Sequence, residues 1–148
     1  MCAFWQEGGE RALSDVADAL YRTSDRLLRN RVCRPALVHG DLWGGNWSMM
    51  EQEEEHEWKN GEGGKEPVVF DPSASFSDPE FEFGIMSMFG GWTLDFEREY
   101  DKIVGGAEKG KEQRVALYEL YHHLNHWNHF GGSYKNSSLA LIRNIIRE

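Results

Sequence analysis

Cysteines, basic side chains and long apolar runs are all scarce in this 148-residue chain. The two cysteines, Cys2 and Cys33, are too few for a disulfide framework, and no C-x-x-C spacing suits zinc or redox chemistry. No apolar stretch approaches the length that spans a bilayer, and the first residues lack the basic and apolar regions of a signal peptide. We therefore expect a cytoplasmic protein without a membrane partner.

Basic residues are outnumbered, 16 against 25 acidic ones, which gives a formal net charge of −9. Such a surface repels phosphate backbones, so nucleic acid is not an expected partner. Seven glutamates fall within residues 51–66, a polar stretch without apolar periodicity. This composition predicts an acidic, flexible insert that lies in solvent.

Aromatic residues, in contrast, are abundant, with six Trp, eight Phe and five Tyr. Their large contact areas suit the core of a single small domain over residues 1–148. Apolar spacing predicts helices over residues 12–29, 80–89, 96–103 and 112–130, and a last helix capped by Ser137 or Ser138. Strands are predicted at 36–38, 47–50 and 67–70, the last two forming a β-hairpin with the acidic insert at its tip. The expected fold class is α+β and mostly α-helical.

The segment between the first two predicted strands has the form H-G-D-x-x-x-x-N, from His39 to Asn46. Kinase catalytic loops share this spacing of an Asp base and a later Asn. Asp41 would accept a proton from an attacking hydroxyl or orient it, and Asn46 would give an oxygen to Mg²⁺. Asp71 directly follows the strand at 67–70 and suits a second metal ligand. The alternative is that Asp41 and Asp71 only cap loops.

His39 is a candidate member of the catalytic group because it stands two residues before Asp41. We expect it to support the loop by hydrogen bonding rather than to carry protons. The histidines at 122, 123, 126 and 129 share a helix face and suggest a zinc site as an alternative. No carboxylate or Cys joins them at ligand spacing, so a hydrogen-bonded core or the wall of a substrate cleft is preferred.

A family resemblance rests on several segments taken together. They are residues 39–46, Phe70-Asp71-Pro72, residues 79–82, residues 88–91 and residues 124–131. Over most of residues 35–147 the chain resembles the fructosamine and ketosamine kinases, relatives of the aminoglycoside and choline kinases. The resemblance implies the C-terminal lobe of a protein-kinase-like fold. It also implies transfer of the γ-phosphate of ATP, with Mg²⁺, to the 3-hydroxyl of a ketosamine on a glycated protein or amine.

The resemblance also assigns roles to single residues. It implies Asp41 as the catalytic base, Asn46 and Asp71 as magnesium ligands, and Glu82 with Gly40 as supports of the loop. Trp43 is the candidate for packing on the sugar. Trp127 and His126 are further candidates for contact with the substrate.

One part of the family pattern has no counterpart in these residues. Family members begin with a lobe that covers the nucleotide phosphates, whereas only 40 residues, read as helical, precede Asp41 here. We therefore expect a catalytic lobe without its nucleotide-gripping partner lobe, weakly active or inactive by itself. The alternative is a catalytically inactive remnant that acts as a binding module.

Overall fold

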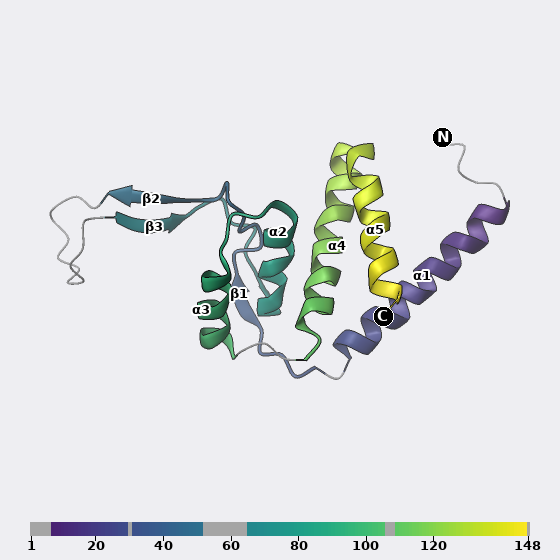
Figure 1. The fold of residues 1–148 in the computed structure, drawn as a ribbon, viewed down its shortest axis with the longest axis horizontal. Coiled ribbons are helices and arrows are strands. Elements are labelled where there is room, and N and C mark those ends of the chain that lie inside the picture. Colours follow the sequence, from purple (N-terminus) through teal and green to yellow (C-terminus); the bar gives the residue numbers. More distant parts are fainter. Residues whose placement is uncertain (1–6, 30, 52–64, 106–108, 148) are drawn as a thin grey trace. The chain divides into compact units, whose positions relative to one another are not determined.

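The computed structural model describes residues 7–29, 31–51, 65–105 and 109–147 (Figure 1). The chain divides into two compact units. One unit consists of Met1–Arg34 with Ala107–Glu148, and the other of Pro35–Gly106. Among the described residues, no helix combines the length and apolarity needed to cross a membrane.

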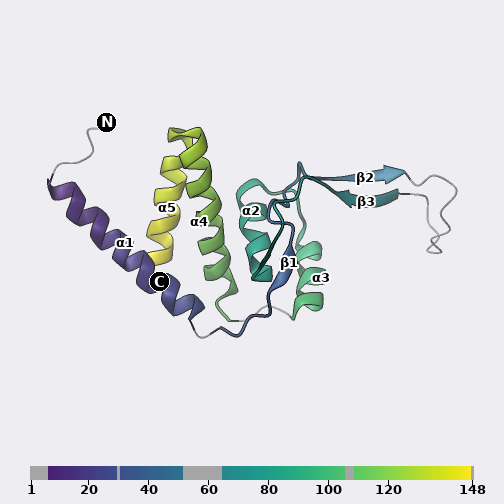
Figure 2. The same cartoon turned by 180° about the vertical axis from the view of Figure 1, so that it is seen from behind.

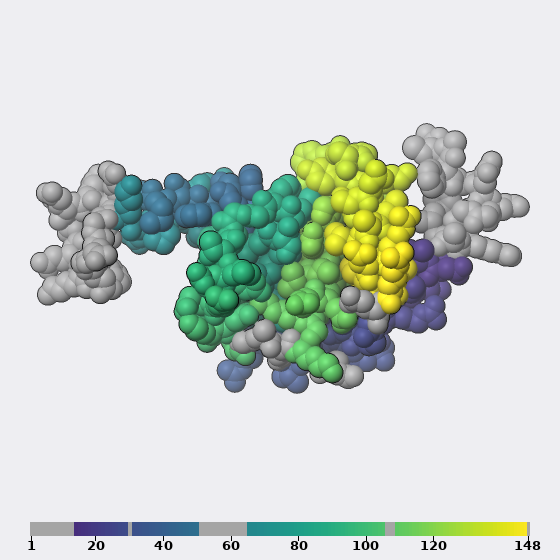
Figure 3. Space-filling view, viewed as in Figure 1, coloured from purple at the N-terminus to yellow at the C-terminus, as the bar shows by residue number. Residues whose placement is uncertain are grey.

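The first unit is helical and consists of α1 (Glu7–Leu28), α4 (Lys111–Phe130), the short 3₁₀ turn η2 (Gly132–Tyr134) and α5 (Lys135–Arg147). α4 and α5 pack against each other, and α1 packs against both (Figures 1 and 2). The space-filling view shows the side chains of α4 and α5 in contact along the pair (Figure 3). Leu120 and Ile145 are the buried hydrophobic residues of this unit's described part. The predicted helices at 12–29 and 112–130 are confirmed.

The last helix begins earlier than the sequence predicted. α5 starts at Lys135 because η2 runs directly into it, so neither Ser137 nor Ser138 is a cap. Both hydroxyls lie within the first turn and donate to the carbonyl of Tyr134, at 2.9 and 2.8 Å. Serine hydroxyls near a helix start can bond backward to the i−3 or i−4 carbonyl in this way.

The described residues of the second unit include four short strands in two antiparallel pairs. β2 (Trp47–Glu51) and β3 (Lys65–Val69) form the predicted hairpin, in register from Trp47 opposite Val69 to Glu51 opposite Lys65. The paired residues of this hairpin therefore include 51, 65 and 66, which were predicted to belong to the flexible insert. The rest of that insert, residues 52–64, lies outside the described residues.

The other pair was not predicted in full. β1 (Ala36–Val38) is the expected strand, but its partner β4 (Ser75–Ser77) was missed because a three-residue, serine-rich segment has no recognisable alternation. The register places Val38 opposite Ser75. This pairing returns the chain from the end of the hairpin to the base of the loop at residues 39–46.

Two helices complete the second unit. The segment predicted as one helix from residue 80 begins with a 3₁₀ turn, η1 (Pro79–Phe81), in which the Asp78 carboxylate accepts from the Glu80 N–H at 2.9 Å. α2 (Glu82–Phe89) follows, and Glu82–Met86 are buried. α3 (Leu94–Val104) is capped by the Thr93 hydroxyl. The core gathers on α2 and beneath the loop, and its buried hydrophobic residues are Val38, Leu42, Phe83, Ile85 and Met86.

Candidate active site

The loop from His39 to Asn46 joins β1 to β2 and is folded tightly on itself. The Trp43 N–H donates to the Asp41 carbonyl at 3.2 Å, and the Asn46 N–H donates to the Trp43 carbonyl at 2.9 Å. Gly40 has φ +78°, and a Cβ there would collide with the carbonyl oxygen of Ser73. Glycine is therefore required next to Asp41 for two reasons, its backbone conformation and the close passage of the neighbouring chain.

The start of the loop is anchored by a buried carboxylate. Glu82, at the first turn of α2, is 3% exposed and accepts from the backbone N–H groups of His39 (2.6 Å) and Gly40 (3.0 Å). Burial raises the pKa of Glu82, while these backbone hydrogen bonds act in the opposite direction. A carboxylate that accepts from loop N–H groups fixes the direction of the backbone that leads into Asp41.

His39 connects the loop to the end of the hairpin. Its Nε2 lies 2.9 Å from the Phe70 carbonyl oxygen, and its Nδ1 accepts from the Asp41 N–H at 3.3 Å. Because Nδ1 is an acceptor, the ring proton is on Nε2 and is donated to Phe70. Both ring nitrogens are used in backbone contacts, which matches a supporting role.

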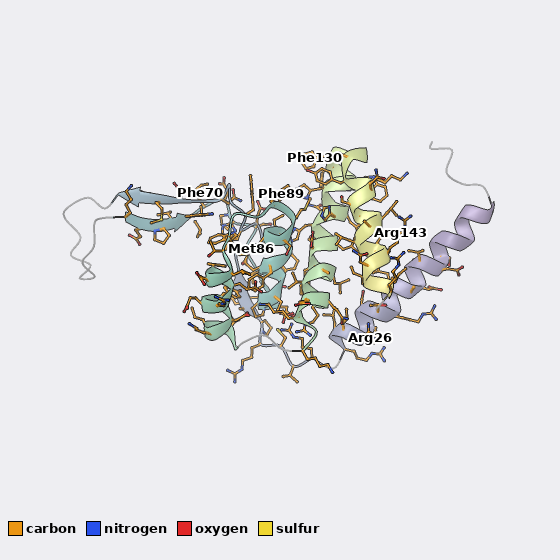
Figure 4. All side chains as sticks on the ribbon, viewed as in Figure 1. Arg26, Phe70, Met86, Phe89, Phe130 and Arg143 are labelled. Carbon is orange, nitrogen blue, oxygen red and sulfur yellow. The ribbon has the colours of Figure 1, made fainter. Side chains whose placement is uncertain are left out.

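Of the three residues predicted to carry chemistry, Asp41 and Asn46 are in direct contact, and Asp71 follows the residue whose backbone pairs with Asn46. Asn46 is 7% exposed, and its side-chain nitrogen donates to both the carbonyl and the carboxylate of Asp41, each at 2.9 Å. The Asn46 backbone carbonyl accepts from the Phe70 N–H at 3.1 Å. Asp71 follows Phe70 directly, so it stands beside Asn46 where the hairpin opens; Figure 4 labels Phe70 at this place. Asp71 is exposed and has φ +53°.

The donor set fits a magnesium ion shared with a substrate. Mg²⁺ prefers oxygen ligands and usually takes one or two carboxylates together with phosphate oxygens. Asp71 offers an exposed carboxylate, and Asn46 is held through its amide nitrogen, which leaves the amide oxygen for a cation. The described residues include no group of three or more His, Cys, Asp or Glu side chains that could hold a metal by themselves.

Residues with predicted substrate roles lie in both units. Trp43 is 36% exposed, and its ring centroid lies 5.5 Å from that of Phe89, another exposed aromatic residue. In α4, His126 Nδ1 lies 2.8 Å from the His122 carbonyl, and the His126 ring contacts that of Tyr134. The roles of Trp43, His126 and Trp127 toward a substrate stay predictions.

The zinc alternative receives no support from the histidines of α4. His123 is hydrogen-bonded through Nδ1 to the hydroxyl of Ser137 at 3.0 Å, and its Nε2 lies 3.4 Å from a carboxylate oxygen of Glu119. Glu119 is a carboxylate at helical spacing from His123 that the sequence prediction overlooked, but the described residues form no group of three or more His, Cys, Asp or Glu that could hold a metal. The Ser137 contact joins α4 to α5, whereas the Glu119 and His126 contacts lie within α4.

Trp92 contacts the loop and was not among the predicted site residues. The indole N–H of Trp92 donates to the carbonyl of Leu42 at 3.0 Å, across 50 positions of sequence. Trp92 lies between α2 and α3 and belongs to no motif. The only available signal is its place directly after Gly90 and Gly91, and that signal is too weak to predict a contact.

A loop with an Asp and a later Asn, followed along the chain by an Asp at the end of a strand, is the order found in kinase-type phosphotransferases. Residues 5–148 match the model of the fructosamine kinase family. This chain belongs to that family.

Individual relatives agree with the family match. The chain is 37% identical to ketosamine-3-kinase of Mus musculus over 142 residues, which cover 96% of this chain and 41% of the relative. It is 36% identical to the chloroplastic protein-ribulosamine 3-kinase of Oryza sativa subsp. japonica over 142 residues, covering 96% and 37% of the two chains. The chain thus spans about two fifths of the length of these curated relatives.

A solved structure shows the same similarity in three dimensions. A crystal structure described as a fructosamine-3-kinase from Thermobifida fusca matches with a TM-score of 0.66 at 27% sequence identity. The match covers 99% of this chain and 44% of that one. The similarity therefore extends over both units and is not confined to the loop.

Proposed function

We propose that this chain carries the catalytic loop and the metal ligands of an ATP-dependent ketosamine 3-kinase with a protein-kinase-like fold. One observation carries the proposal. Asn46 contacts the carboxylate of Asp41 with its side chain, and its backbone pairs with Phe70, the residue before Asp71. A candidate base and two candidate metal ligands therefore share one small region.

In the proposed reaction, Asp41 accepts the proton of the attacking 3-hydroxyl or orients that hydroxyl toward the phosphate. Asn46 holds the Asp41 carboxylate in place, while Glu82 and His39 accept from the backbone N–H groups of residues 39–41, which lead into it. Asn46 and Asp71 would hold Mg²⁺. When bound, the ion supplies charge neutralisation on the phosphates of ATP.

The names of the relatives and the exposed rings of the loop support the proposed substrate class. Relatives bear the names ketosamine-3-kinase and protein-ribulosamine 3-kinase, so the proposed acceptor is a ketosamine on a glycated protein or amine. Trp43 and Phe89 offer exposed rings beside the loop. Aromatic rings of this kind pack well on the apolar face of a sugar.

The test is phosphorylation of a fructosyl-lysine peptide with ATP and Mg²⁺, followed by mass spectrometry. Residues 1–148 are assayed alone and joined to the N-terminal part of a ketosamine-3-kinase. We expect weak nucleotide binding by the chain alone and phosphorylation at the 3-hydroxyl by the joined protein. Low-micromolar binding of ATP by the chain alone would show that the phosphate-covering lobe matters less than proposed.

In the joined protein, Asp41→Asn is expected to lower kcat by about 10²- to 10⁴-fold, the usual contribution of a positioned general base. The matched control is Asp95→Asn on α3, where the side chain is 86% exposed. Melting temperatures should be similar for both variants. Turnover by Asp41→Asn at nearly the wild-type rate would remove Asp41 from the mechanism.

A further inference from the structure

The connection between α2 and α3 contacts the part of the catalytic loop that follows Asp41. Within this connection, the Trp92 indole N–H donates to the carbonyl of Leu42 at 3.0 Å. Leu42 directly follows Asp41, and its side chain is 8% exposed. The N–H group of Leu42 meanwhile adds to the stabilisation of the Glu82 carboxylate. The carbonyl of Leu42, the residue after Asp41, is therefore held by a side chain that lies just beyond the end of α2.

The Trp92 ring is itself held by two other rings. Its centroid lies 4.2 Å from that of Phe96 in α3 and 5.2 Å from that of Trp47, the first residue of β2. Trp47 directly follows Asn46. Trp92 thus bonds to the residue after the candidate base and also packs on the residue after the candidate metal ligand.

Backbone contact fixes the position from which Trp92 reaches the loop. The Gly44 N–H donates to the Gly90 carbonyl at 3.1 Å. A Cβ on Gly91, which has φ +102°, would collide with the backbone of Gly44. The two segments therefore touch main chain to main chain, and Trp92 is the next residue along.

We infer that Trp92 is a positioning residue for Asp41: its indole N–H holds the Leu42 carbonyl and so fixes the backbone that carries the candidate base. This inference rests on the proposed function for its catalytic meaning, but not for its structural part. α2 then supports the loop at both of its ends. Glu82, at the start of α2, accepts hydrogen bonds from loop N–H groups. Trp92, beyond the end of α2, donates a hydrogen bond to a loop carbonyl.

The chain offers a matched control for this contact. The indole nitrogen of Trp47 is also buried, but it has no hydrogen-bond partner within the described residues. Trp92→Phe and Trp47→Phe each remove an indole and keep an aromatic ring. Only the first change removes a hydrogen bond to the loop, so the difference between the two variants reports that bond.

The experiment measures amide hydrogen exchange of the complete chain by NMR, at the N–H groups of Trp43 and Asn46. A net hydrogen bond corresponds to roughly 2- to 10-fold in an equilibrium, so Trp92→Phe should accelerate exchange by about that factor relative to Trp47→Phe. Phe96→Leu, which loosens the Trp92 ring but keeps its N–H, should accelerate exchange by a smaller factor. In the joined protein, Trp92→Phe should lower kcat and leave the KM for ATP unchanged.

The outcomes separate this inference from the proposed function. Equal loop exchange in Trp92→Phe and Trp47→Phe would overturn the positioning role, and so would a KM effect without a kcat effect. If Trp92→Phe does not fold, unaltered loop exchange in Phe96→Leu overturns it instead. Faster exchange in Trp92→Phe, combined with no phosphorylation by the wild-type joined protein, would support the positioning of the loop and refute the proposed function.

Discussion

The two units of the chain position their polar side chains over different distances in the sequence. In the unit of residues 35–106, Glu82 reaches back 43 positions to the His39 N–H, and Trp92 reaches back 50 positions to Leu42. In the helical unit, Ser24 and Ser138 bond to carbonyls only four positions back, and the contact between Ser137 and His123 spans 14 positions. A local bond can be exchanged for water with little change in shape, whereas a long-range bond places one segment against another. Changes in the first unit should therefore disturb geometry, and changes in the helices mainly stability.

The largest effect on stability is expected at Glu82. Glu82→Gln keeps the shape but replaces one acceptor oxygen by a donor that faces the N–H groups of the loop. Leaving such a buried group unsatisfied should lower the free energy of unfolding by about 2–4 kcal/mol. Urea denaturation measures this loss of free energy. Glu99→Gln is the control, because the Glu99 side chain is 68% exposed. Equal midpoints for the two variants would mean that the carboxylate does not anchor the loop.

The helical unit should lose stability as the pH falls. Burial lowers the pKa of His122 from 6.5 to about 4, and His126 and His123 add to the effect. The unfolded chain takes up this proton near pH 6.5 and the folded chain only near pH 4. The stability that neutral His122 contributes is therefore complete above pH 6.5 and lost as the pH falls toward 4, by about 2–3 kcal/mol.

His122→Gln should remove this part of the pH dependence. Urea denaturation at pH 7, 5.5 and 4 would compare the wild type with this variant, and His129→Gln, an exposed position on the same helix, is the control. If the free energy of unfolding of His122→Gln falls with pH as steeply as that of the wild type, other groups cause the loss of stability in acid.

A smaller effect is expected at Asp71, where charge and backbone conformation can be tested separately. At φ +53°, Asp71→Ala should cost about 1 kcal/mol, whereas Asp71→Asn should melt like the wild type because Asn tolerates this conformation. Both variants lose the carboxylate and should need more Mg²⁺ for half-maximal activity in the joined protein. An unchanged Mg²⁺ requirement in Asp71→Asn would argue against the metal role.

The smallest effect is expected from the acidic insert. Because Glu51 pairs with Lys65, residues 52–64 can be replaced by the two-residue turn Asn-Gly, which suits a hairpin of this register. Shortening a loop lowers its closure cost by roughly 0.6 kcal/mol per halving, so the variant should melt no lower than the wild type and should keep the activity of the joined protein. A large loss of kcat/KM with an unchanged melt would instead make the insert functional.

Local pattern was enough to propose the candidate residues of the site. The spacing from His39 to Asn46, together with Asp71 after a short apolar run, depends only on neighbouring residues. In the structure Asn46 contacts Asp41, and its backbone pairs with Phe70, the residue before Asp71. The hairpin and the helices at 12–29 and 112–130, whose apolar residues recur at regular intervals, were also predicted from local pattern.

The features that the sequence did not predict depend on contacts between distant segments. β4 exists because Ser75 pairs with Val38, and three residues carry no periodic signal of their own. Trp92 reads as one aromatic residue among many until its N–H is seen on Leu42. The start of α5 was misplaced because η2 and α5 are continuous, so no cap at Ser137 or Ser138 was needed.

The close pair of Trp47 and Trp92 gives the loop an optical signature. Their rings lie 5.2 Å apart with planes inclined by 30°, a separation at which two indole chromophores exchange excitation energy. Circular dichroism in the indole absorption bands should therefore carry a coupled signal from residues that flank Asn46 and contact Leu42. Because the signal is intrinsic, the state of the loop can be followed in solution without a label while nucleotide or sugar is added.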